Sequence, residues 1–310
     1  MAAAFLVGVL VAVQSRINAG LSEQVGGGLV AASVSFGTGL VLAAVIVISR
    51  GTGRAAVAGL PNLVRTGSLR WWQLLGGLGG AWLVTTQGLV VVVVGVTIFT
   101  VGVVAGQVAG SLLVDRWGLS PAGRLGVTLR RAVAAAVALI AVIVSAVSAT
   151  DASLHLSWVV LLAVSAGFGI SVQQAINGRV SSATGQPLAA TLVNFVVGFS
   201  ALALATVVGL AVGYVQFGAW PSEWWLYLGG PIGVLFIALA AWAVRGVGVL
   251  VFGLLTIAGQ LTGSVLLDTL LPTGTAPLGW PQWGGLLLIA FSVLLAAMPN
   301  RGAMSGKMAR

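Results

Sequence analysis

Two stretches of the chain decide the fold by repeating each other: residues 13–39, VQSRINAGLSEQVGGGLVAASVSFGTG, and residues 172–198, VQQAINGRVSSATGQPLAATLVNFVVG. They align without gaps, so that Gln14 meets Gln173 and Asn18 meets Asn177. Chance similarity between two apolar stretches can supply matching Ala and Val residues, but it does not supply amides in the same order. An internal repeat is the first feature to interpret in any sequence, and here it predicts two copies of one unit.

A second pair of matching stretches lies further along each copy, AGQVAGSLLVD at residues 105–115 and AGQLTGSVLLD at residues 258–268. Each copy also carries a Trp pair followed by three glycines, which are Gly76, Gly77 and Gly80 in the first copy and Gly229, Gly230 and Gly233 in the second. The repeated unit therefore extends over about half of the chain.

The composition places both copies in a lipid bilayer. Of the 310 residues, 59% are hydrophobic and 6% are charged, against about 25% charged in an average soluble domain. A membrane-spanning helix needs about 20 apolar residues, and such stretches run over residues 2–21, 29–49, 71–93, 96–117, 130–149, 157–178, 188–213, 223–244, 247–269 and 279–298. Because these stretches lack the apolar–polar alternation of transmembrane strands, the sequence predicts an all-α integral membrane protein with ten transmembrane helices.

The two copies are expected to have opposite orientations in the membrane. Each copy holds five predicted helices, an odd number, so the second copy must enter the bilayer from the other side. With the amino terminus in the cytoplasm, all Lys and Arg residues except Arg16 fall on the cytoplasmic side, as the positive-inside rule requires. We therefore expect two inverted five-helix repeats, at residues 1–150 and 151–299, followed by a basic tail at residues 300–310, with both termini in the cytoplasm. Inverted repeats of this kind are typical of alternating-access transporters, whose substrate site lies between the repeats.

The residues that most enzymes and metal sites need are scarce. The chain has five acidic residues, one His (His155) and no Cys, whereas metal sites and nucleophilic catalysis use such residues in clusters. It also lacks the G-x-x-x-x-G-K-[ST] motif of ATP-hydrolysing proteins. We expect no cofactor and no metal, and we interpret the net charge of +9 as a record of membrane orientation rather than as a nucleic-acid-binding surface.

These paired motifs carry a resemblance to a known family. The five-plus-five inverted layout, the Q-x-x-I-N element at residues 14–18 and 173–177, and the G-Q-x-x-G-S-x-x-x-D element at residues 106–115 and 259–268 resemble the drug/metabolite transporter superfamily, specifically its YdcZ-like branch. The resemblance implies an EamA-like inner-membrane transporter in which helices 1–4 and 6–9 surround a central cavity and helices 5 and 10 lie at the periphery. It implies no particular substrate.

Polar side chains recur at four-residue spacing on several predicted helices, which places them on one helix face. Because an amide in hydrocarbon is costly without a partner, these stripes are expected to face the interior. There they either line a cavity for a polar substrate or form interhelical hydrogen bonds, which contribute about 0.6 kcal/mol each. For Gln107 and Gln260, near mid-depth, we favour the cavity. The candidate substrate-binding residues are Gln14, Asn18, Gln107, Ser111, Gln173, Gln174, Asn177, Gln260 and Ser264.

Ionisable side chains inside a membrane are functional candidates by default, and here they are few. Coupling of transport to an ion would have to use Asp115, Asp268 or Glu23, all near predicted helix ends. A carboxylate at such a position is more often a helix cap or the partner of an arginine, such as Arg116 beside Asp115.

The sequence therefore predicts a secondary transporter for a small polar or amphipathic metabolite, embedded in the cytoplasmic membrane as a monomer or a homodimer. An accessory or structural subunit is one alternative, and its polar stripes would pack against neighbouring helices without a cavity between the repeats. A membrane-embedded enzyme is a second alternative, and it would need Asp115 and Asp268 to meet in one pocket.

Overall fold

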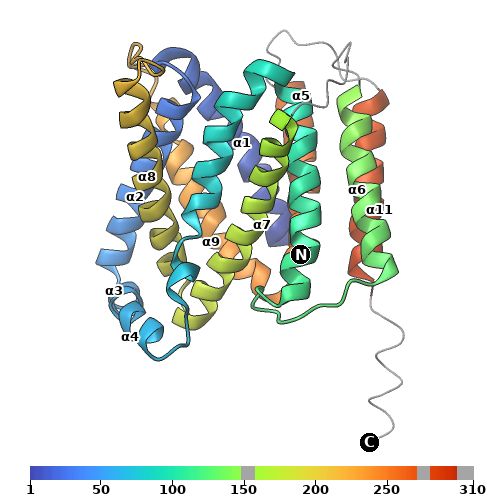
Figure 1. Cartoon of the computed structure of the whole chain (residues 1–310), viewed down its shortest axis with the longest axis horizontal. Helices are drawn as coiled ribbons and strands as arrows, with labels where there is room; N and C mark the ends of the chain where they lie inside the picture. The colour runs from blue at the N-terminus through green and yellow to red at the C-terminus, as the bar shows by residue number, and fades with distance from the viewer. Residues whose placement is uncertain (148–157, 271–279, 299–310) are drawn as a thin grey trace, which may run out of the picture.

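Helices make up all the regular secondary structure in residues 1–147, 158–270 and 280–298, the part of the chain that this computed structural model describes (Figure 1). In hydrocarbon a helix satisfies its own backbone groups, which explains why the long apolar runs adopt this form. The elements are α1 (Ala2–Val25), α2 (Gly28–Ser49), α3 (Gly51–Ala58), α4 (Leu60–Arg65), η1 (Trp71–Leu74), α5 (Gly77–Trp117), α6 (Leu129–Val147), α7 (Trp158–Thr184), α8 (Pro187–Ala211), η2 (Trp224–Tyr227), α9 (Gly229–Val247), α10 (Val249–Leu270) and α11 (Trp280–Ala297). The expected repeat boundary near residue 150 and the expected tail at 300–310 lie outside the described residues.

Five helical segments of the described chain are both long enough and apolar enough to cross a membrane. They are Ala2–Val25, Gly28–Ser49, Pro187–Ala211, Trp224–Val247 and Val249–Leu267, and each coincides with a span expected from the sequence. The other expected spans fall in α5, α6, α7 and α11, which are helical as well. The chain is thus a helical protein with several membrane-spanning segments.

One long helix, α5, contains two of the expected spans. A straight helix of 41 residues would be about 61 Å long, twice the roughly 30 Å of a hydrocarbon core. Both halves of α5 nevertheless pack along α7: Trp82 Nε1 donates to Ser165 Oγ at 3.0 Å, and a Cβ on Gly106 would lie 1.9 Å from Val164 O. The helix therefore bends back on itself between these contacts (Figure 1). Residues 77–117 form one helix and contain no proline, so every residue keeps its backbone N–H donor through the bend.

Glycines bring helices from the two halves of the chain into backbone contact. A Cβ on Gly8 or on Gly259 would lie 2.0 Å from a carbonyl oxygen of the opposite helix, so the backbones of α1 and α10 touch. Gly106 and Gly167 do the same between α5 and α7, at 1.9 and 1.8 Å. Small residues at helix crossings allow this close approach in membranes. Each half therefore packs mainly through helices of the other half.

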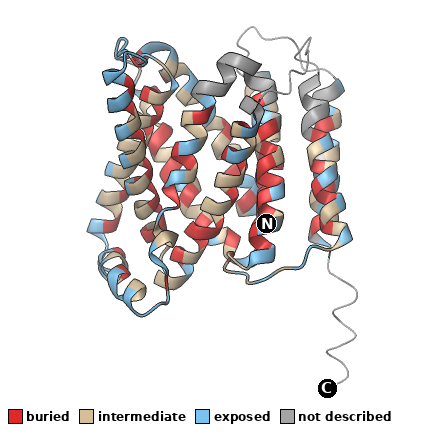
Figure 2. Ribbon diagram, in the orientation of Figure 1, coloured by how far each residue is buried: buried red, intermediate tan, exposed pale blue. Residues whose placement is uncertain are grey.

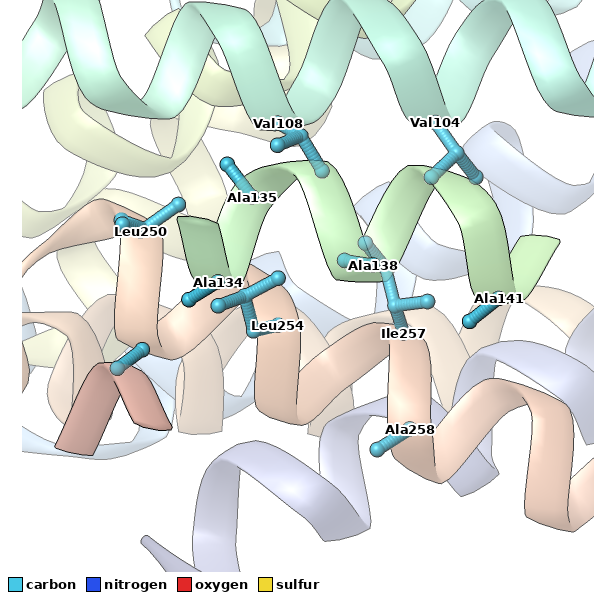
Figure 3. Packing of buried hydrophobic residues seen from close by; sticks show 11 residues of the cluster. Val104, Val108, Ala134, Ala135, Ala138, Ala141, Leu250, Leu254, Ile257 and Ala258 are labelled. Atoms are coloured by element: carbon cyan, nitrogen blue, oxygen red, sulfur yellow. The ribbon is translucent and has the colours of Figure 1, made fainter. Parts of the chain in front are cut away.

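The helices α6 and α11 lie side by side at one edge of the bundle (Figure 1). Buried apolar side chains of α6 meet those of α5 and α10 in one cluster, in which small alanines of α6 face larger residues such as Val108 and Leu254 (Figure 3). Ser292 Oγ of α11 donates to Ala134 O of α6 at 2.7 Å. Apolar packing joins this edge to the rest of the molecule, and neither α6 nor α11 carries a candidate site residue.

Burial follows the pattern of a protein in lipid. Buried residues gather on the helix faces that are turned toward the bundle, and exposed residues lie on the outward faces (Figure 2). Many of the exposed residues are large and apolar, among them Val41, Leu204 and Leu287. A soluble monomer rarely exposes contiguous apolar surface of this extent, so the outward faces suit hydrocarbon.

The short helices α3 and α4 close one end of the bundle. Leu60 is buried in a cluster with Val180 of α7 and Ala190 of α8, while Arg54 and Arg65 on the same segment are exposed. The segment 51–65 thus lies over the ends of α7 and α8 with its apolar side inward. The opposite end of α8 leads into the loop 212–223, where Val215 and Leu226 of η2 are buried with Val30 of α2.

Candidate functional site

Two amides of α1 lie against glycines of α9. Gln14 Nε2 donates a hydrogen bond to Gly229 O at 2.7 Å. A Cβ on Gly229 would lie 2.1 Å from Asn18 Oδ1 and 2.7 Å from Ser35 Oγ, so only glycine leaves room for these polar groups. The amide pair of α1 and the glycine motif of the second repeat, which the sequence treats as separate features, are therefore parts of one crossing.

The same arrangement recurs between α7 and the start of α5. A Cβ on Gly76 would lie 2.5 Å from Asn177 Oδ1, and one on Gly79 would lie 3.0 Å from Gln173 Oε1. Asn177 Nδ2 donates to Asn194 Oδ1 of α8 at 2.9 Å. The amides of each half thus meet the glycines of the other half, in two equivalent crossings.

Several buried polar atoms of these helices have no hydrogen-bond partner among the described residues. They are Asn18 Oδ1, Gln173 Oε1 and Asn194 Nδ2 at the crossings, and Gln174 Oε1 next to Gln173 in the chain. An unsatisfied buried polar group costs about 1–3 kcal/mol, and in a native protein each such group needs an explanation. Groups of this kind are able to bind a polar ligand without first giving up a bond within the protein.

Two phenylalanines separate the crossings. Phe36 of α2 and Phe195 of α8 have ring centroids 5.3 Å apart. A Cβ on Gly80 would lie 3.3 Å from both Phe36 Cζ and Gln173 Oε1, and a Cβ on Gly233 would lie within 3.1 Å of both Phe195 Cζ and Gln14 Nε2. Each ring therefore lies beside one glutamine amide, and the candidate site combines amides with aromatic surface.

Asn194, Phe36 and Phe195 are not among the candidate site residues that the sequence predicts. Asn194 aligns with Ser35 in the repeat, so it has no matching amide in the first copy. A signal was present, because an Asn inside the predicted span 188–213 needs a polar partner. The two phenylalanines do match between the copies, but an apolar match in an apolar helix indicates packing as readily as function.

The polar stripe of α5 is buried and bonded. Ser171 Oγ of α7 donates to Gln107 O at 2.7 Å and lies 3.1 Å from Ser111 Oγ. The void next to Gln107, Ser111 and Gly253 is too small to hold a water molecule. In this conformation the Gln107 side chain therefore adjoins tight packing.

The matching stripe of α10 has a different environment. Gln260 is half-buried and Ser264 is exposed, although both align with buried residues of α5. The side chain of Asp268, which the enzyme alternative would place in one pocket with Asp115, lies outside the described part of the structure.

Asp115 links three helices at the end of α5. It is fully buried, its Oδ1 accepts from Val249 N at 2.8 Å and its Oδ2 from Leu250 N at 3.1 Å, and it forms an ion pair with Arg131 of α6. The free N–H groups at a helix start favour a negative charge, so this carboxylate caps α10.

The ion-pair partner of Asp115 is Arg131 rather than its sequence neighbour Arg116, which is exposed. Glu23, the third coupling candidate, is exposed near the end of α1.

Comparisons with known proteins identify the family and a shared fold. The family model described as "Putative inner membrane exporter, YdcZ" matches residues 1–144 and 158–295. "Inner membrane protein YdcZ" of Escherichia coli (strain K12) is 27% identical over 137 residues, which are 43% of this chain and 91% of that protein. That relative is therefore about half as long as this chain. A solved structure described as "Crystal structure of protein" has a TM-score of 0.60 at 16% identity, covering 99% of this chain and 96% of that chain, and it shows a shared fold alone.

Proposed function

The chain belongs to the YdcZ family of inner membrane proteins, and from this premise we propose that it is a secondary transporter that moves a small polar or amphipathic metabolite across the cytoplasmic membrane. The family model is described as that of a "Putative inner membrane exporter". We further propose that the chain forms ten transmembrane helices in two inverted five-helix repeats, with both termini in the cytoplasm, and that it transports by alternating access.

The reciprocal crossings are the observation that carries the proposal. Amides of α1 lie against glycines of α9, and the matching amides of α7 lie against glycines at the start of α5. An exchange of this kind is what two units related by an axis in the membrane plane produce at their interface. The half-length relative, matched over 91% of its length by 43% of this chain, supports the view that one half is a complete unit. The arginine distribution supports the opposite orientations of the two halves.

The candidate binding groups lie at this interface. Rocking of one repeat against the other would widen one crossing while the other stays closed, and the unpaired atoms of Asn18, Gln173 and Asn194 would then face an aqueous opening. Neutral amides and aromatic rings suit a zwitterionic, neutral or amphipathic substrate better than a highly charged one. Gln107 and Gln260 remain part of the proposed substrate path. The proposal also keeps the carboxylate of Asp115, Asp268 or Glu23 as the group that would couple transport to an ion.

The test has two stages. Purified protein is screened against a library of amino acids, sugars and amphipathic amines for compounds that raise its unfolding temperature, and each stabilising compound is then tested for uptake into proteoliposomes. We expect at least one compound to be both bound and transported. Gln173→Ala is expected to lower its uptake by tenfold or more, because a hydrogen bond to a polar substrate is lost.

Gln24→Ala is the matched control, since Gln24 is exposed at the end of α1, and its uptake should equal that of the wild type. Binding without transport would favour an accessory or structural subunit. Unchanged uptake in both Gln173→Ala and Gln107→Ala would remove these amides from the path.

A further inference from the structure

A groove of about 680 Å³ runs along the outward face of the molecule between α2 and α8. Its walls extend from Val30 to Val41 on α2 and from Phe199 to Leu210 on α8, with Phe217 and Trp220 of the loop 212–223 at one end. On each helix the lining residues follow the helical period, so one face of each helix forms one wall. We infer that this groove binds one acyl chain of a membrane phospholipid.

The length of the groove fits one leaflet. Each wall covers eleven residue steps, which correspond to about 16 Å of helix. Half of a typical hydrocarbon core is about 15 Å thick. An acyl chain entering from the surface would therefore reach along the whole groove and end at its inner limit.

The chemistry of the walls favours hydrocarbon over a polar ligand. The groove is lined almost entirely by apolar atoms, and its hydroxyl groups already have partners: Ser33 Oγ and Thr206 Oγ1 lie 2.8 Å apart, and Thr38 Oγ1 donates to Ser35 O at 3.1 Å. A polar molecule would lose its hydration here without gaining hydrogen bonds, whereas an acyl chain gains contact with both helices.

The two ends of the α2–α8 seam differ in their exposed aromatic residues. Near the ends of α7 and α8, α3 and α4 cover the seam and insert Leu60 beside Ala190. Near the loop 212–223, Val215 of the loop and Leu226 of η2 pack against Val30. Phe217 and Trp220 line the groove at this end and lie exposed, with ring centroids 6.4 Å apart. Aromatic rings prefer the headgroup level of a bilayer, so they mark where the lipid headgroup would lie.

The groove adjoins the α1–α9 crossing but is lined by other residues. Thr38 lines the groove, and a Cβ on Gly230 of α9 would lie 2.2 Å from its Oγ1. None of the described lining residues is a candidate substrate-binding residue, so lipid labelling and metabolite uptake depend on different side chains and either one can fail in an experiment without the other.

Photo-crosslinking locates the acyl chain in the full-length protein. The chain is placed in nanodiscs of phosphatidylethanolamine and phosphatidylglycerol that contain a phosphatidylethanolamine with a diazirine on one acyl chain. We expect labelling of peptides 30–41 and 199–210 to exceed that of the exposed face of α11 around Leu287 several-fold. Labelling in proportion to exposure alone would overturn the proposal, as would crosslinks that join a second copy of the chain at the groove.

Two tryptophan variants on one helix provide the control. Ala203→Trp fills the groove and is expected to lower the labelling of peptide 30–41 about tenfold, the effect of losing contact with about two methylene groups. Leu204→Trp lies on the neighbouring, exposed face of α8 and should leave the labelling unchanged. Equal labelling in both variants would overturn the proposal, and if Ala203→Trp does not fold, the labelling pattern of the wild type decides.

Discussion

The two copies of one motif, residues 105–115 in α5 and 258–268 in α10, share their glycine contacts but differ in their polar surroundings. Gly106 and Gly259 each meet a carbonyl oxygen of the helix they cross. Ser111, in contrast, is buried beside Ser171 while Ser264 is exposed. Helix crossing geometry is thus common to both copies, whereas the environment of each polar side chain depends on which helices surround that copy. A repeat in sequence predicts shared backbone packing more securely than it predicts a shared site.

The largest expected effect comes from the polar end of the α5 copy. Asp115→Ala should lower the free energy of unfolding by about 3–5 kcal/mol, because it leaves Arg131 as a buried unpaired charge and removes the cap of α10. The measurement is SDS titration of the detergent-solubilised protein, followed by tryptophan fluorescence. Glu23→Ala removes an exposed carboxylate and should change the free energy by less than about 0.5 kcal/mol. If Asp115→Ala loses no more free energy of unfolding than Glu23→Ala, the buried network contributes little to stability.

The matching glycines of the two copies should contribute similarly to the free energy of unfolding. Gly106→Ala and Gly259→Ala each place a methyl group about 2 Å from a backbone oxygen, so each should cost about 1–3 kcal/mol by overpacking. Gly246→Ala, where a Cβ meets nothing within 4 Å, is the control and should be neutral or slightly stabilising. A large loss in one copy alone would break the equivalence of the crossings.

The matching serines of the two copies, Ser111 and Ser264, should differ in their contribution to the free energy of unfolding. Ser111→Ala is expected to cost about 1 kcal/mol, since it removes a buried contact with Ser171. Ser264→Ala should stay within about 0.5 kcal/mol of the wild type. Thermal unfolding followed by tryptophan fluorescence compares the two variants directly. Equal effects would mean that the two polar stripes have the same environment after all.

Much of the fold could be predicted from the sequence, because apolar length and glycine spacing act locally. The helices, the paired glycines and the family all follow from such patterns. The continuity of α5 through its bend could not, since the sequence predicts separate spans at 71–93 and 96–117 and only the shared packing on α7 shows how they join. The contact of Asp115 with Arg131 depends on where α6 returns to α5. For the same reason the sequence could not predict that Asn194 supplies the partner of Asn177.

The glycine contacts between α1 and α10 also have a consequence for how the protein is made. Gly8 cannot reach its crossing until the ribosome has produced Gly259, about 250 residues later. At about 5–20 residues per second, α1 waits some 10 to 50 seconds with its small-residue face unpaired. During synthesis the first half must therefore rest in the membrane as an incomplete assembly, and its final packing is a late step that follows translation of α10.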